Sequence, residues 1–191
     1  MIKKRVGVLI SGGGSNMHAL LKASRAADYP AEIVCVVSNI PEAGGLKIAH
    51  SEGIATHVVS HKNHATREDF DAALNAYLQS QKLDIIACAG FMRIMTPVLI
   101  VPWQGRMINI HPSLLPLYKG QHTHQRAIAD GQTEAGCTVH YVTLELDGGP
   151  VIAQTRVPIL HGDTAEKLAA RVLIEEHKLY SAALAKVAAG I

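Results

Sequence analysis

Apolar runs rich in Val and Ile alternate along the chain with segments of helical periodicity. Strands are predicted at Arg5–Ile10, Glu32–Ser38, Thr56–Ser60, Asp84–Ala89, Arg106–Ile110, Thr138–Leu146 and Val151–Pro158. Helices are predicted at Ser15–Ala26, Gly44–Glu52, Thr66–Gln81, Thr96–Val101, Thr123–Asp130 and Thr164–Ala189. Because strand–helix–strand alternation requires crossover connections, this order predicts an α/β fold. We expect a single open, mainly parallel sheet of about seven strands with helices on both faces and a Rossmann-like N-terminal half.

The last two predicted strands depart from that alternation. Thr138–Leu146 alternates between two faces, and only Asp147-Gly148-Gly149-Pro150 separates it from Val151. A connection this short predicts an antiparallel hairpin near the C-terminus. Since no linker or repeat interrupts the pattern, residues 1–191 are expected to form a single domain.

The composition narrows the classes of function. The net charge of +2 and the scattered aromatic residues do not form the basic, stacking patch of a nucleic-acid-binding protein. The first apolar run is too short for a signal sequence or a membrane span, so we expect a cytoplasmic protein without a membrane partner. The three cysteines lack zinc or redox spacing and are expected to be buried, reduced thiols. A monomer and a homodimer both fit this composition.

The stretch SGGGSN, residues 11–16, directly follows the first predicted strand and opens a helix. Glycines let backbone N–H groups approach a ligand, and a helix start attracts negative charge. The stretch lacks the Lys-Ser/Thr ending of a P-loop and the last glycine of the dinucleotide fingerprint. We interpret it as a phosphate cradle; the alternative is a tight turn with Ser15 as N-cap.

The stretch INIHPSLLP, residues 108–116, places two polar side chains at the end of a strand. Asn109 and His111 are two residues apart and therefore leave the same face of that strand. Asp147 lies at a second strand–turn junction, and a carboxylate beside an imidazole favours its protonated form. An amide donor can hold an oxyanion, and no Ser or Cys nucleophile is nearby, so the trio suits acyl transfer directly to a bound amine. Taken singly, His111 is also typical of an ordinary strand end and Asp147 of a turn.

Glu176 interrupts an apolar stripe on the last predicted helix. The stripe consists of Ala169, Val172, Leu173, Tyr180, Ala183 and Leu184. An inward carboxylate indicates a hydroxyl-rich ligand or a buried Arg partner, whereas a rotated stripe leaves Glu176 in solvent.

The motifs SGGGSN, FMRIM, INIHPSLLP, HTH and ELDGGPVI occur in this order over nearly the whole chain. In this the sequence resembles the folate-dependent formyltransferases, in particular those that formylate glycinamide ribonucleotide in purine synthesis. The resemblance implies transfer of the formyl group of 10-formyltetrahydrofolate to the glycine amine of glycinamide ribonucleotide, without a metal.

The resemblance also implies roles for individual residues. Asn109, His111 and Asp147 would be catalytic. Gly14, Ser15, Asn16, Leu173 and Glu176 would bind the ribonucleotide. Arg67, Met92, Arg93, Ile94 and Met95 would bind the folate, together with Asn109, Thr143, Leu144, Glu145, Leu146 and Asp147. His122 and His124 would lie in a flanking loop. Residues 1–100 would form the phosphate-binding half and residues 101–191 the folate-binding and catalytic half.

Two departures from the family pattern concern the ribonucleotide. Gly13 stands where Asn is frequent, and Leu173 stands where some members have a polar residue.

Two other functions remain open at this stage. One is a metal-dependent hydrolase with His111, His122, His124 and Asp147 as ligands. The other is a binding domain for a phosphorylated metabolite, without catalysis, built on the glycine loop.

Overall fold

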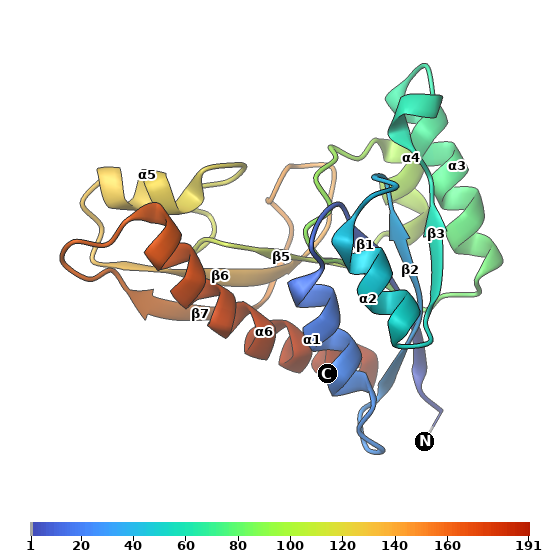
Figure 1. Cartoon of the computed structure of the whole chain (residues 1–191), viewed down its shortest axis with the longest axis horizontal. Coiled ribbons are helices and arrows are strands. Elements are labelled where there is room, and N and C mark those ends of the chain that lie inside the picture. Colours follow the sequence, from blue (N-terminus) through green and yellow to red (C-terminus); the bar gives the residue numbers. More distant parts are fainter. Residues whose placement is uncertain (1) are drawn as a thin grey trace.

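A computed structural model describes residues 2–191 of the chain. Within these residues seven strands form one sheet, in the order β3-β2-β1-β4-β5-β6-β7 (Figure 1). The strands are β1 (Lys4–Ile10), β2 (Ala31–Ser38), β3 (Ala55–Val58), β4 (Ile85–Cys88), β5 (Met107–His111), β6 (Glu134–Tyr141) and β7 (Val151–Pro158). Pairing is parallel from β3 to β5 and antiparallel for β5–β6 and β6–β7. The predicted α/β fold, with antiparallel strands near its C-terminus, is confirmed.

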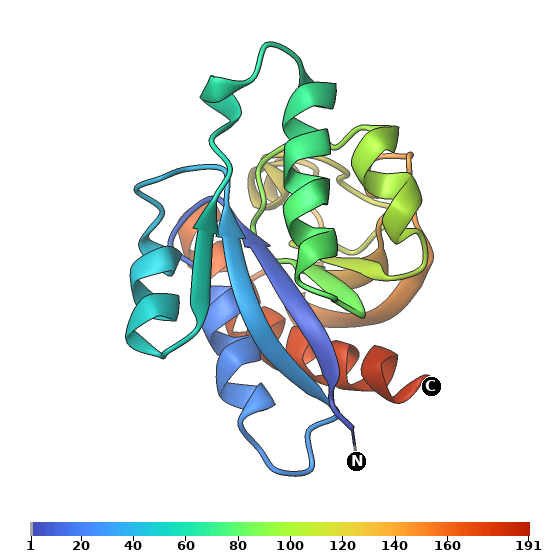
Figure 2. The ribbon, with the colours of Figure 1, turned by 90° about the vertical axis from the view of Figure 1, so that its right-hand side faces the viewer.

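Helices cover both faces of the sheet (Figure 2). They are α1 (Ser15–Ser24), α2 (Gly44–Ser51), α3 (Arg67–Ser80), α4 (Pro97–Ile100), α5 (Thr123–Ala129) and α6 (Ala165–Ala189), with short 3₁₀ turns at His61–Asn63 and Val101–Trp103. Side chains of β1 alternate between two cores. Val6 and Val8 pack with α1 and α6, whereas Leu9 packs with α3 and α4. The crossovers thus bury both faces of the parallel strands.

The predicted strand Thr138–Leu146 is wrong at both ends. Strand β6 starts at Glu134, where Glu134 pairs with Pro158 of β7, although residues 134–137 show little strand pattern in the sequence. It ends at Tyr141 because β5 begins at Met107, which leaves no partner beyond Val142 on that side. Residues 142–150 consequently form a loop rather than a strand.

Other boundaries differ by one to three residues. Strand β3 is shorter than the predicted Thr56–Ser60, and the predicted helix Thr96–Val101 divides into α4 and the 3₁₀ turn that follows it. Strand β5 extends to His111, so the imidazole is fixed by the sheet itself.

Tyr180 ties helix α6 to the middle of the sheet. Its buried hydroxyl lies 2.8 Å from the Cys88 carbonyl oxygen and 3.3 Å from the Ile108 carbonyl oxygen. Because α6 is fixed against β4 and β5, the position of Glu176, one turn earlier, is also fixed.

The three cysteines are free and buried, as predicted. Among residues 2–191, no helix combines the length and the apolar character needed to cross a membrane.

Candidate active site

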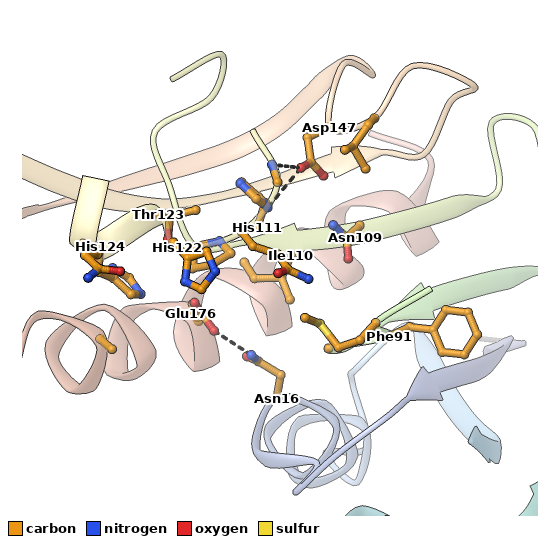
Figure 3. A pocket seen from close by; sticks show the side chains of 18 of the residues that line it. Asn16, Phe91, Asn109, Ile110, His111, His122, Thr123, His124, Asp147 and Glu176 are labelled. Atoms are coloured by element: carbon orange, nitrogen blue, oxygen red, sulfur yellow. Dashed lines mark hydrogen bonds and ion pairs between the residues drawn. The ribbon is translucent and has the colours of Figure 1, made fainter. Parts of the chain in front are cut away.

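A cavity of about 960 Å³ lies at the carboxyl edge of β1, β4 and β5 (Figure 3). Its walls come from the start of α1, the segment after β4, the end of β5, residues 120–125 at the start of α5, Leu146 and Asp147 in the loop after β6, and the first half of α6. This is the edge where open α/β sheets bind ligands, on either side of the point at which the strand order reverses.

Asn109 and His111 both face this cavity from β5, as the period of two predicts. The Nδ1 atom of His111 lies 3.4 Å from Oδ2 of Asp147, and the two side chains are 8% and 9% exposed. The Nε2 atom of His111 lies 2.9 Å from the carbonyl oxygen of Tyr118, which can only accept a hydrogen bond. Acceptor oxygens therefore face both ring nitrogens of His111 and fix the orientation of its ring.

Asp147 owes its position to an unusual backbone conformation. It has a φ of 49°, in the left-handed region that Asp tolerates better than most residues. Gly149 follows in a place where a Cβ atom would lie 1.8 Å from the carbonyl oxygen of Tyr141. The turn brings Oδ2 of Asp147 within 2.9 Å of the N–H of Gly120, which donates to it. The sequence DGG thus aims a buried carboxylate at His111.

His140 is a site residue that the sequence analysis missed. It is 2% exposed, and its Nε2 atom lies 3.2 Å from Nδ2 of Asn109 and 3.6 Å from Oδ1 of Asp147. Its Nδ1 atom faces the carbonyl oxygen of Tyr141 at 2.9 Å and must therefore carry the proton. Burial lowers the pKa of His140, partly offset by the Tyr141 bond and the Asp147 charge. In the neutral ring Nε2 accepts from Asn109, which fixes the orientation of that amide.

Asn16 and Glu176 meet on the other side of the cavity (Figure 3). The amide of Asn16 donates to Oε2 of Glu176 at 2.6 Å. Glu176 is 7% exposed, and burial raises its pKa, opposed by the Asn16 bond and the charge of His111. The inward orientation is therefore confirmed, with an amide rather than an Arg as partner. Oδ1 of Asn16 is buried and finds no hydrogen-bond partner within residues 2–191.

The glycine loop, which leads into Asn16, packs closely against the backbone of Gly45 in α2. Gly14 has a φ of 76°, and a Cβ atom there would lie 2.7 Å from the Cα of Gly45. Gly14 occupies the N-cap position of α1, and no side chain caps the helix, so the alternative of Ser15 as N-cap is wrong. Gly12 and Gly13 face open space, which leaves their backbone accessible.

The structure brings eleven of the predicted site residues to the cavity. They are Asn16, Met92, Arg93, Ile94, Asn109, His111, His122, His124, Leu146, Asp147 and Glu176. Eight others lie outside its lining, namely Gly14, Ser15, Arg67, Met95, Thr143, Leu144, Glu145 and Leu173. Arg67 is exposed at the start of α3, and Met95 packs partly into the core.

His122 and His124 stand at the start of α5. His122 has a φ of 59° and immediately precedes the helix, and His124 lies in its first turn. Burial, with the nearby charge of His111, lowers the pKa of His124. Over residues 2–191, no group of three or more His, Cys, Asp or Glu side chains is arranged to hold a metal ion.

Comparison with known proteins identifies the family. Residues 4–184 match the family described as formyl transferase. The chain belongs to this family. It is 44% identical over 173 residues to phosphoribosylglycinamide formyltransferase of Escherichia coli (strain K12), covering 91% of this chain and 82% of that protein.

Two further relatives extend the comparison. The chain is 45% identical over 188 residues to the human trifunctional purine biosynthetic protein adenosine-3, covering 98% of this chain and 19% of that protein. It therefore spans about a fifth of the length of this curated relative. The crystal structure of phosphoribosylglycinamide formyltransferase from Brucella melitensis matches with a TM-score of 0.94 at 55% identity, covering 99% of this chain and 97% of that one.

Proposed function

We propose that this formyl transferase family member transfers the formyl group of 10-formyltetrahydrofolate to the glycine amine of glycinamide ribonucleotide, releasing tetrahydrofolate, in purine synthesis. The observation that carries the proposal is the convergence of Asn109, His111 and Asp147 in one cavity with the Asn16–Glu176 pair. Groups suited to acyl transfer and a polar pair suited to hydroxyl groups share one cavity. The E. coli and Brucella relatives named for this reaction support the choice of substrates.

In the catalytic trio, Asn109 and His111 stabilise the oxyanion, and Asp147 accepts the proton of the amine. Asn109 presents an amide N–H, and His111 a protonated imidazole, to the formyl oxygen as the amine attacks. Asp147, held by Gly120 and facing His111, accepts the amine proton directly or through water. The tetrahedral intermediate then collapses as the bond between the formyl carbon and the folate nitrogen breaks, and that nitrogen is protonated as tetrahydrofolate leaves. Much of the acceleration comes from holding two substrates in one orientation.

The binding roles are those that the resemblance implies, and Asn16, Met92, Arg93, Ile94, Leu146, Asp147 and Glu176 line the cavity. The backbone of Gly14 and Ser15 and the side chain of Asn16 hold the phosphate, and Glu176 accepts from the ribose hydroxyls. Met92, Arg93 and Ile94, together with the loop from Thr143 to Asp147, frame the pterin of the folate. Residues 1–100 supply the phosphate loop and residues 101–191 supply the catalytic trio. The free, buried cysteines support a cytoplasmic location, where thiols remain reduced.

The test is release of tetrahydrofolate by the purified protein with both substrates and EDTA present. Release that depends on glycinamide ribonucleotide is the expected result. Release without the ribonucleotide indicates a deformylase. Loss of activity in EDTA that returns with added metal indicates the metal-dependent alternative.

A further inference from the structure

Residues 90–96 run along one side of the cavity, between β4 and α4, without regular secondary structure. Met92 and Ile94 project outward, 65% and 58% exposed, whereas Phe91 and Met95 pack against the core. We call residues 90–96 the β4–α4 segment. A segment without a helix or strand ladder needs other contacts to hold its shape.

Ser11 holds the first part of the β4–α4 segment. Its hydroxyl oxygen accepts from the N–H of Met92 at 2.8 Å, and its own N–H donates to the Gly90 carbonyl oxygen at 3.0 Å. The hydroxyl proton goes to Oδ1 of Asn39, 2.5 Å away, and Asn39 is 3% exposed. Because the Ser11 hydroxyl donates its hydrogen bond to Asn39, a lone pair of the hydroxyl oxygen is left to accept from the Met92 N–H.

Asp71 holds the other end of the β4–α4 segment. This residue of α3 is fully buried, and its Oδ2 atom accepts from the N–H of Thr96 at 2.5 Å. Phe70, which precedes Asp71 in α3, also contacts the segment: the guanidinium of Arg93 lies over its ring, 5.6 Å from the ring centre. Between the two anchors, the main chain of residues 93–95 makes no hydrogen bond with any of residues 2–191. The conformation of this stretch therefore depends on its ends.

We propose that Ser11 and Asp71 are positioning residues for the folate. They fix the backbone of the β4–α4 segment so that it fits a reduced pterin, although neither side chain lines the cavity. Ser11 is also the first residue of the glycine loop, so its hydroxyl joins the phosphate-binding and pterin-binding loops. The inference rests on the proposed function for the identity of the ligand, but not for the anchoring itself.

The variants are Ser11→Ala and Asp71→Asn, with Ser80→Ala and Asp69→Asn as matched controls. Ser80 is an exposed hydroxyl at the end of α3, bonded to the Tyr77 carbonyl oxygen, and Asp69 is exposed in the first turn of α3. We expect the calorimetric Kd for tetrahydrofolate to rise about 10-fold in each test variant, because a lost or weakened anchor leaves a backbone N–H poorly paired. The KM for the ribonucleotide should stay within about 2-fold, since neither substitution alters the groups proposed to bind it, Gly14 to Asn16 and Glu176.

Hydrogen–deuterium exchange of residues 90–97, without ligand, separates positioning from general destabilisation. The expected result is exchange about 10-fold faster in this segment alone, with the controls like the wild type. Unchanged exchange or an unchanged Kd in both variants would overturn the proposal. An equal loss of affinity for the folate and for the ribonucleotide would also overturn it. If Asp71→Asn does not fold, Ser11→Ala decides alone. Intact tetrahydrofolate binding without formyl transfer would overturn the proposed function and leave this inference standing.

Discussion

Two buried carboxylates face the same cavity and have opposite surroundings. Asp147 accepts from the Gly120 N–H and faces Nδ1 of His111 at 3.4 Å. Glu176 has a single amide partner, Asn16, and burial raises its pKa. Several donors fix the orientation of a carboxylate, whereas a carboxylate with one donor keeps acceptor sites free for a ligand. The comparison separates a preorganised catalytic charge from a binding group whose remaining donors come from the ligand.

The largest expected loss of activity comes from substituting Asp147 or its partner His111. His111→Ala and Asp147→Asn should each lower kcat about 1000-fold, because each removes a group that acts only on the developing charge and the proton. Steady-state release of tetrahydrofolate measures this, with circular dichroism as the check on folding. Turnover near that of the wild type in either variant would contradict the catalytic assignment.

A smaller loss of activity, through weaker binding of the ribonucleotide, is expected from substituting Glu176 or its partner Asn16. Glu176→Gln and Asn16→Ala should raise the KM for glycinamide ribonucleotide about 10- to 100-fold with less change in kcat, because hydrogen bonds to the ribose (Glu176) or to the phosphate (Asn16) are lost. Glu175→Gln is the matched control, since Glu175 pairs with Lys178 on the outer face of α6. An effect confined to kcat would remove the distinction between the two carboxylates.

His140 tests how the catalytic side is held in place. His140→Ala should lower kcat about 10-fold, because the Asn109 amide loses the acceptor that fixes its orientation. His140→Gln retains an acceptor and should recover part of the rate, while His161→Ala, at an exposed position, should have no effect. Equal losses in His140→Ala and His140→Gln would argue for a proton-transfer role instead.

The smallest expected effect is on stability. Burial raises the pKa of Glu176 in the folded protein. The contribution of Glu176 to the free energy of unfolding is therefore complete at low pH and is lost as the pH rises through that raised pKa. The free energy of unfolding of the wild type, relative to Glu176→Gln, should therefore be larger at pH 5 than at pH 8. Urea unfolding at the two pH values measures the difference. A difference of the opposite sign would mean that Glu176 is stabilised as an anion in the folded state.

Periodicity in the sequence was sufficient for Asn109 and His111, which share a face because β5 is a strand. For Glu176 the apolar stripe of α6 left an inward and a solvent-facing orientation open, and packing of the helix on the sheet selects the inward one. Asp147 was identified from its motif, but its loop was predicted as strand because Val142 and Leu144 continue the alternation.

Groups that depend on register or on tertiary contacts escaped prediction. His140 becomes a partner of Asn109 only through the antiparallel pairing of β5 with β6, and β6 begins four residues before its visible pattern. Ser11 and Asp71 act on residues about 81 and 25 positions away, which no local pattern reveals. The eight predicted residues outside the cavity lining were assigned by resemblance, and their roles stay predictions.

The most direct test of the two-carboxylate comparison is calorimetric binding of glycinamide ribonucleotide to Asp147→Asn and Glu176→Gln. The account predicts that Asp147→Asn binds with nearly the wild-type Kd yet does not transfer formyl groups. It predicts that Glu176→Gln binds at least about 10-fold more weakly. Similar losses of affinity in both variants, or intact affinity in Glu176→Gln, would contradict the account.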